Sequence, residues 1–178
     1  MKEKKFLIVV DMQRDFIDGS LGTKEAQAIV PAAAKRIRAC REAGFTVIAT
    51  LDTHEENYLD TPEGRKLPVP HCIRGTAGWQ LDPRIAAEVQ NGLLVEKPTF
   101  GSVRLPEIIA GLTAPEETPV LHLLGLCTDI CVISNALLLK AHFPDACIAV
   151  YRDSCAGVTP MLHQAALDTM QSCQIDLI

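Results

Sequence analysis

Short apolar runs alternate along this chain with longer segments whose apolar residues recur at helical spacing. The runs are rich in Val, Ile and Leu and predict strands at residues 6–10, 46–51, 93–96, 120–126, 146–151 and 174–178. The longer segments predict helices at residues 24–43, 105–112, 131–142 and 160–171. This alternation predicts an α/β fold with a mostly parallel sheet, and right-handed crossovers would place helices on both of its faces.

The length and charge of the chain narrow the class of protein. A chain of 178 residues fits one domain, residues 1–178, and a net charge of −5 without a basic run argues against nucleic-acid binding. Only five apolar residues follow the basic start, and no run approaches the roughly 18 residues of a membrane helix. We therefore expect a cytoplasmic protein with no membrane partner. Its seven cysteines are expected to be reduced.

Polar clusters directly follow four of the predicted strands. They are Asp11, then Asp52 with His54, then Lys97, and finally Cys127, Asp129 and Cys131. The carboxyl ends of parallel strands border the crevice in which ligands bind. The pattern therefore predicts one site that holds a carboxylate, a lysine, a cysteine and a metal-binding pair, a set suited to nucleophilic attack on a carbonyl group.

Cys131 is the candidate nucleophile. Thr128 and Asp129 are good N-cap residues, so Cys131 is expected in the first turn of the next helix, where the helix dipole would lower the pKa of its thiol. The alternative is a buried structural cysteine, the usual fate of cysteine in an Ala/Leu-rich segment. A metal or redox pair with Cys127 is disfavoured, because such pairs commonly have CxxC-like spacing.

Two further residues could complete a catalytic set with this cysteine. Asp11 could accept the thiol proton and later activate water, although an Asp here could equally cap a turn. Lys97 could hold a thiolate and keep Asp11 ionised, although most lysines are solvated at the surface. The catalytic interpretation is stronger for the three residues together than for each alone, because all three would meet at the same edge of the sheet.

A long polar loop at about residues 52–79 predicts a metal site. Asp52 and His54 form a D-x-H pair, and His71 and Glu63 follow in the same loop; together they could bind Zn²⁺, Fe²⁺ or Mn²⁺. Glu55, Glu56 and Asp60 compete with Glu63 for the acidic position. The alternative is a polar loop with solvated histidines. Phe16 and Trp79 could wall the pocket, although aromatic residues are more often in the core.

The chain resembles the nicotinamidases, a branch of the isochorismatase-like cysteine hydrolase superfamily. The matching stretches are FLIVVDMQRDF, DTH, PHCIRGTAGW, EKPTFGS and GLCTDICV, which span residues 6 to about 157. The resemblance implies a three-layer α/β/α fold with a six-stranded sheet in Rossmann-like order. It also implies an Asp11–Lys97–Cys131 triad and a metal bound by Asp52, His54 and His71. Glu63 would be the fourth ligand only in the branch that uses an acid there.

The resemblance further implies an oxyanion hole formed by the backbone N–H groups of Cys127 and Cys131, and a cis peptide between Leu126 and Cys127. Phe16, Leu126 and Cys127 would contact the substrate. The expected reaction is hydrolysis of nicotinamide in pyridine nucleotide salvage, with one divalent metal ion, preferably zinc, and no organic cofactor. We expect a homo-oligomer, as is common in the superfamily. Two alternatives stay open: hydrolysis of another small amide, carbamoyl or ureido compound, and a non-enzymatic metal- or thiol-dependent binding protein.

Overall fold

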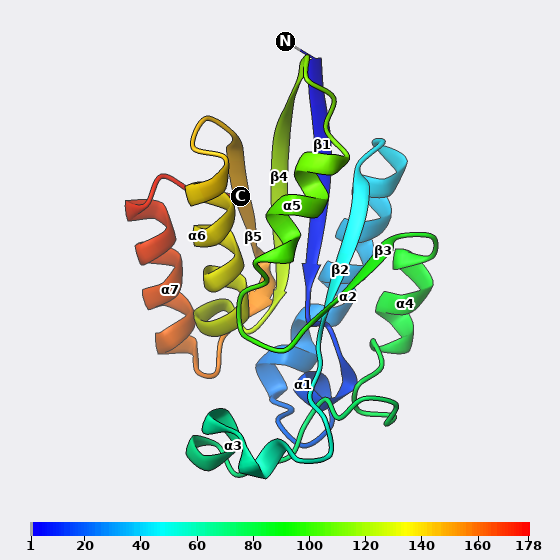
Figure 1. Cartoon of the computed structure of the whole chain (residues 1–178), viewed down its shortest axis with the longest axis vertical. Coiled ribbons are helices and arrows are strands. Elements are labelled where there is room, and N and C mark those ends of the chain that lie inside the picture. The colour runs from blue at the N-terminus through cyan, green and yellow to red at the C-terminus, as the bar shows by residue number, and fades with distance from the viewer. Residues whose placement is uncertain (1) are drawn as a thin grey trace.

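The computed structural model describes residues 2–178, which form a parallel six-stranded sheet between two layers of helices (Figure 1). The strands are β1 (Lys2–Val10), β2 (Thr46–Asp52), β3 (Leu93–Lys97), β4 (Glu117–Leu126), β5 (Cys147–Ala156) and β6 (Asp176–Leu177). Their order, β3-β2-β1-β4-β5-β6, confirms the predicted Rossmann-like arrangement and the α/β/α class. All neighbouring strands pair in parallel, so the mostly parallel sheet that was predicted is entirely parallel.

Helices cover both faces of the sheet. They are α1 (Arg14–Ile17), α2 (Lys24–Glu42), α3 (Pro62–Lys66), α4 (Pro83–Val89), α5 (Arg104–Gly111), α6 (Ile133–His142) and α7 (Pro160–Ser172), with short turns η1 (Tyr58–Asp60) and η2 (Thr128–Val132). Helices α2 and α4 pack together on one face, while α5, α6 and α7 form the layer on the other (Figure 1). Among residues 2–178, no helix combines the length and apolar character needed to span a bilayer.

Strand β1 lies at the centre of the sheet and of the core. It pairs with β2 on one side and β4 on the other, and its apolar residues 6–10 are fully buried. A strand covered by helices on both faces is expected to be continuously apolar, as this run is. The carboxyl ends of β1 and β2 point to the end of the molecule where α1 and α3 lie (Figure 1).

Several predicted elements have different bounds in the structure. The fifth strand continues to Ala156, beyond the predicted end at residue 151, and the last strand contains only Asp176 and Leu177. The predicted helix at residues 131–142 begins earlier, because the one-turn π-helix η2 leads directly into α6.

The sequence did not predict the short helices α1, α3 and α4. Helix α4 has a recognisable start, because the Asp82 side chain accepts a hydrogen bond from Arg84 N and Pro83 occupies the first helical position. Only two turns follow, too few for a clear apolar period. Within the loop predicted at residues 52–79, the structure forms η1 and α3.

Candidate active site

Asp11 directly follows the central strand in an unusual backbone conformation. Its φ of 47° lies in the left-handed region, which Asp tolerates better than most residues. Its backbone N–H lies 3.3 Å from the Thr50 carbonyl oxygen and 3.2 Å from Thr50 Oγ1, and that hydroxyl donates to Asp11 Oδ1 at 2.6 Å. Thr50 in the neighbouring strand β2 therefore holds both the backbone and the carboxylate of Asp11.

Lys97 ends the edge strand β3, yet its ammonium group is fully buried. Nζ lies 2.6 Å from Asp11 Oδ2, 3.4 Å from Asp52 Oδ1 and 3.5 Å from Cys131 Sγ. It also donates to the Thr99 carbonyl oxygen at 3.1 Å. Burial lowers the pKa of Lys97, but the charges of Asp11, Cys131 and Asp52 outweigh it and raise the pKa above its usual value. The ammonium thus joins the carboxylates to the thiol.

Cys131 lies in η2, in the first turn that leads into α6, as expected. Its surroundings contradict the predicted lowering of its pKa. Burial, followed by the negative charge of Asp11, raises the pKa of the Cys131 thiol well above its usual value, and Lys97 offsets this only in part. The helix-dipole argument was wrong because it considered the turn without the buried carboxylate beside it.

Lys97 was predicted to keep Asp11 ionised by lowering its pKa, but the effect of burial on this pKa is larger. Desolvation raises the pKa of Asp11 although the Lys97 charge lowers it. A carboxylate with a raised pKa is a stronger base than an exposed one, which suits the acceptance of a proton.

The backbone before Cys131 makes a close approach to β1. Gly125 has a φ of 127°, and a Cβ atom built on it would lie 2.1 Å from the Val10 carbonyl oxygen, so only glycine fits. The next peptide, between Leu126 and Cys127, is cis, as the resemblance implied. The Cys127 carbonyl oxygen then accepts hydrogen bonds from Ile130 N and Val132 N at 3.1 Å. Cys127 is thereby tied to the turn that carries Cys131.

The four predicted metal ligands converge beside this triad. Ligand atoms of Asp52, His54 and His71 all lie within 4.8 Å of one another. Glu63 Oε1 lies 3.7 Å from Nε2 of each histidine. Two imidazole nitrogens and two carboxylates form a donor set that suits a divalent zinc, iron or manganese ion, so the residues present fit such a group.

Neighbouring groups orient the His71 ring and keep the Asp52 carboxylate charged. His71 Nδ1 lies 2.8 Å from the Val69 carbonyl oxygen, which can only accept, so Nδ1 donates and Nε2 faces the cluster. Burial raises the pKa of Asp52, but hydrogen bonds from His54 and His71 lower it well below its usual value. Asp52 therefore remains an anion. Of the competing acids, Glu55 instead accepts a hydrogen bond from Arg74 Nε at 2.9 Å.

Sequence reasoning missed the group that supports Asp52. The fully buried Gln13 side chain accepts a hydrogen bond from Asp52 N at 2.8 Å and donates to the carbonyl oxygens of Asp52 and Trp79 at 2.9 and 2.7 Å. It thus joins β2 to the far end of the metal-site loop. The available signal in the sequence was the position of Gln13, a polar residue two positions after Asp11 at the end of the first predicted strand.

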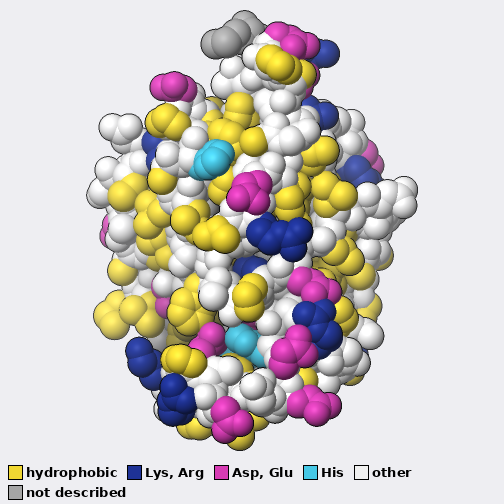
Figure 2. Space-filling view, in the orientation of Figure 1, with side chains coloured by type: hydrophobic (Ala, Val, Ile, Leu, Met, Phe, Trp, Pro, Cys, Tyr) yellow, Lys and Arg dark blue, Asp and Glu magenta, His cyan; other side chains and the backbone are white. Residues whose placement is uncertain are grey.

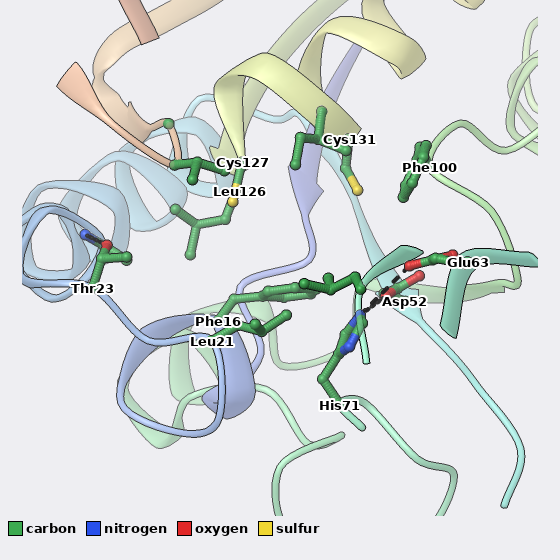
Figure 3. Close-up of a pocket in the computed structure, with 15 residues that line it drawn as sticks. Phe16, Leu21, Thr23, Asp52, Glu63, His71, Phe100, Leu126, Cys127 and Cys131 are labelled. Atoms are coloured by element: carbon green, nitrogen blue, oxygen red, sulfur yellow. Dashed lines mark hydrogen bonds and ion pairs between the residues drawn. The ribbon is translucent and has the colours of Figure 1, made fainter. Parts of the chain in front are cut away.

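Cys131 and three of the four predicted metal ligands line one apolar cavity of about 250 Å³ (Figure 3). In Figure 3 the Cys131 sulfur points into this cavity from above, while Asp52, Glu63 and His71 lie together at one end and Thr23 at the other. The lining residues are Phe16, Leu21, Thr23, Ala26, Asp52, Glu63, Leu67, His71, Phe100, Leu126, Cys127, Ile130, Cys131, Gly157 and Val158.

The predicted contact residues Phe16, Leu126 and Cys127 all line this cavity. The Phe16 ring centroid lies 5.5 Å from that of His71, so Phe16 flanks the ligand cluster. Trp79 was also expected at the pocket but does not line it. Its Nε1 donates to Thr53 Oγ1 at 2.9 Å, and the ring faces a separate surface hollow beside β3.

Comparison with known proteins identifies the family. The isochorismatase domain model matches residues 5–178. An uncharacterised isochorismatase family protein of Bacillus subtilis is 30% identical over 173 residues, 92% of each chain, and the nicotinamidase/pyrazinamidase of Mycobacterium tuberculosis is 26% identical over 189 residues, 97% of each chain. The crystal structure of the Pyrococcus horikoshii pyrazinamidase in complex with zinc superposes with a TM-score of 0.81 at 28% identity, covering 98% of each chain. The chain therefore belongs to the isochorismatase family, on the branch whose named members include nicotinamidases.

Proposed function

We propose that this protein is an amidohydrolase that converts nicotinamide to nicotinate and ammonia. One observation carries the proposal: Cys131, which contacts a buried Lys97–Asp11 ion pair, lines the same small cavity as the metal-binding side chains of Asp52, Glu63 and His71. A volume of about 250 Å³ lies just below the range of about 300–1,000 Å³ usual for ligand pockets, so the substrate is small.

The lining of the cavity favours a neutral, flat substrate. Apolar side chains dominate it, and none of the described lining residues is a lysine or an arginine. A ureido or carbamoyl acid would place its carboxylate against this apolar wall, where no lysine or arginine side chain can pair with it. The Phe16 ring instead offers a surface on which an aromatic ring can stack.

The metal cluster accounts for the choice of a pyridine ring. Asp52, His54, His71 and Glu63 would hold one divalent ion, preferably zinc. When bound, this ion would supply an open coordination position for the ring nitrogen of the substrate. The ring would then lie between the cluster and Cys131, with its carboxamide group directed toward the thiol.

The triad residues would carry the first half of the reaction. Asp11 accepts the proton of the Cys131 thiol, while Lys97 stabilises the sulfur as it becomes negative. The sulfur attacks the amide carbon, and the backbone N–H groups of Cys127 and Cys131 stabilise the negative oxygen. Asp11 returns the proton to the amide nitrogen, the C–N bond breaks, and ammonia leaves a thioester on Cys131.

Water completes the cycle. Asp11 accepts a proton from a water molecule whose oxygen attacks the thioester carbon, the C–S bond breaks, and the proton returns to Cys131. Nicotinate is released and the enzyme regains its initial protonation state. The raised pKa of Asp11 suits this role, because the same carboxylate must accept and release a proton in each half-reaction.

Ammonia release from nicotinamide by the purified protein tests the proposal directly. The assay compares untreated protein, chelator-treated protein and chelator-treated protein to which zinc has been restored. Release that the chelator abolishes and zinc restores is the expected result. Release only from another small amide would reject nicotinamide as the substrate, and no activity on any amide would favour a binding protein.

A further inference from the structure

A second cavity borders the metal cluster, with His54 and Glu63 in its wall. Its volume is about 560 Å³, and its wall carries more polar surface than that of the amide pocket. Glutamate and arginine side chains line it, together with hydroxyl and amide groups. Charged side chains of both signs are interspersed over the face of the molecule in Figure 2, so this cavity does not belong to a surface of one charge.

The two cavities meet at the reacting groups. Glu63 lines both cavities, while Cys131 lines the amide pocket and Lys97 lines the polar cavity. Lys97 Nζ lies 3.5 Å from Cys131 Sγ and donates at 3.1 Å to the carbonyl oxygen of Thr99, another residue of the polar cavity. The buried Lys97 ammonium group therefore contacts both the sulfur and a backbone oxygen of a residue that lines the polar cavity.

The amide pocket is poorly suited to admit water once the cysteine is acylated. An apolar cavity of about 150 Å³ holds one benzene ring, so an aromatic acyl group would take up much of the 250 Å³ present here. The remaining wall is mainly apolar, and a water molecule needs two to four polar partners. The polar cavity offers such partners, including the carboxylates of Glu55 and Glu96, each of which also accepts a hydrogen bond from Arg74.

We propose that the polar cavity is a second access to the active site. Water would enter through it to hydrolyse the thioester, and the ammonium ion would leave through it. This inference rests on the proposed amidohydrolase function. Ammonia takes up one proton from solvent as it leaves, and the carboxylic acid product later returns one proton to solvent. The carboxylates of Glu55 and Glu96 and the Thr99 carbonyl oxygen can accept hydrogen bonds from the resulting ammonium ion. Substrate and water would therefore reach Cys131 from different sides.

A tryptophan at the polar cavity tests this separation. Asn57 lines that cavity, its side chain is exposed and makes no capping hydrogen bond, so Asn57→Trp can narrow the cavity without removing an internal contact. Leu59→Trp is the matched control, because Leu59 lies in the same turn, is 51% exposed and lines neither cavity. Leu67→Trp places the same ring at the amide pocket instead.

The readouts are kcat, kcat/KM for nicotinamide, and the fraction of Cys131 acylated at steady state, measured by mass spectrometry after rapid quenching. Asn57→Trp is expected to raise the acylated fraction and to slow thioester hydrolysis by about tenfold, a barrier increase of about 1.4 kcal/mol, with kcat/KM maintained. Leu67→Trp should lower kcat/KM without raising the acylated fraction.

The proposal is overturned if Asn57→Trp accumulates no more acylated enzyme than Leu59→Trp, or if it acts like Leu67→Trp on kcat/KM. Circular dichroism and unfolding midpoints of the three variants establish that each is folded. If the Asn57→Trp variant does not fold, Thr99→Trp can be used instead, because Thr99 lines the same cavity. Failure of the proposed function can be distinguished from failure of this inference, because in the first case the wild-type protein would release no ammonia in the same assay.

Discussion

The two halves of the candidate site are built in different ways. Asp11 and Lys97 stand at the carboxyl ends of β1 and β3, on either side of β2, and both side chains are buried. Cys131 lies in η2, between the end of β4 and helix α6. The metal-binding residues after Asp52 come from a loop, and the Glu63 side chain remains 23% exposed. The sheet itself sets the distances within the triad, whereas the loop needs separate supports.

Those supports can be identified. The backbone of His54 makes two hydrogen bonds with the segment that follows His71. His54 N donates to the Cys72 carbonyl oxygen at 3.0 Å, and the His54 carbonyl oxygen accepts from Arg74 N at 2.8 Å. Gln13 anchors the two ends of the loop, and the Asp15 carboxylate accepts from Cys72 N at 2.8 Å. In the proposed mechanism, the rigid half would carry the chemistry and the braced loop would orient the substrate.

The largest expected effect concerns the nucleophile. Cys131→Ala should lower kcat by roughly 10⁴-fold or more, because the covalent route is lost, while the fold is retained. Cys127→Ala is the matched control: it removes the neighbouring thiol of the same pocket but keeps the backbone N–H proposed for the oxyanion hole. Initial rates of ammonia release measure both. Substantial turnover by Cys131→Ala would rule out the thioester.

Removal of Lys97 should damage the rigid half most. Lys97→Met leaves the carboxylates of Asp11 and Asp52 buried without their shared cation, which should lower the free energy of unfolding by about 3–5 kcal/mol. The double variant Lys97→Met/Asp11→Asn should regain part of this loss but no activity. Urea unfolding measures the stabilities. Equal stability of the single and double variants would show that the ion pair does not hold the site together.

A smaller effect is expected from the brace of the loop. Gln13→Leu removes three hydrogen bonds to the backbone at Asp52 and Trp79 and should weaken zinc binding by about 10–100-fold. Gln13→Glu keeps an acceptor for Asp52 N and should lose less. Competition with a chelator of known affinity measures the zinc dissociation constant. Unchanged affinity in Gln13→Leu would mean that the loop holds its ligands without this anchor.

The smallest effect lies outside the site, where the structure predicts a pH-dependent stability. Burial, followed by the charges of Lys5 and Arg36, lowers the pKa of His122 below 6.5 in the folded protein. The unfolded chain then binds more protons, so this stabilisation is present above pH 6.5 and is lost as the pH falls through that value toward the folded pKa.

The variant His122→Gln can still accept the hydrogen bond from the Tyr151 hydroxyl, whose oxygen lies 2.8 Å from His122 Nδ1. Its urea midpoint should therefore decline less than that of the wild type on acidification. Parallel midpoint curves for the two proteins would contradict the assignment.

The sequence predicted the rigid half better than the loop, for a physical reason. Strand ends in a parallel sheet converge by topology, so Asp11, Lys97 and Cys131 could be placed together from periodicity alone. In the loop, spacing left several acids in competition for the position of Glu63. Only the fold, which turns Glu55 toward Arg74, separates them.

Electrostatics were the least predictable feature. The thiol of Cys131 was expected to have a lowered pKa from its place in a helix, but the direction depends on burial and on Asp11, which is 120 residues distant in sequence. The role of Gln13 likewise depends on backbone groups brought together only by folding. Both properties require three-dimensional neighbours that no local pattern encodes.

The most direct test of the division between the two halves compares nicotinamide with benzamide, which has the same carboxamide but no ring nitrogen. The measurement is kcat/KM for both amides, before and after zinc is restored to chelator-treated protein. The account predicts that zinc raises kcat/KM for nicotinamide and leaves the slow hydrolysis of benzamide unchanged. An equal gain for both amides would contradict it, because the metal site would then act on the reacting carbonyl rather than on the ring.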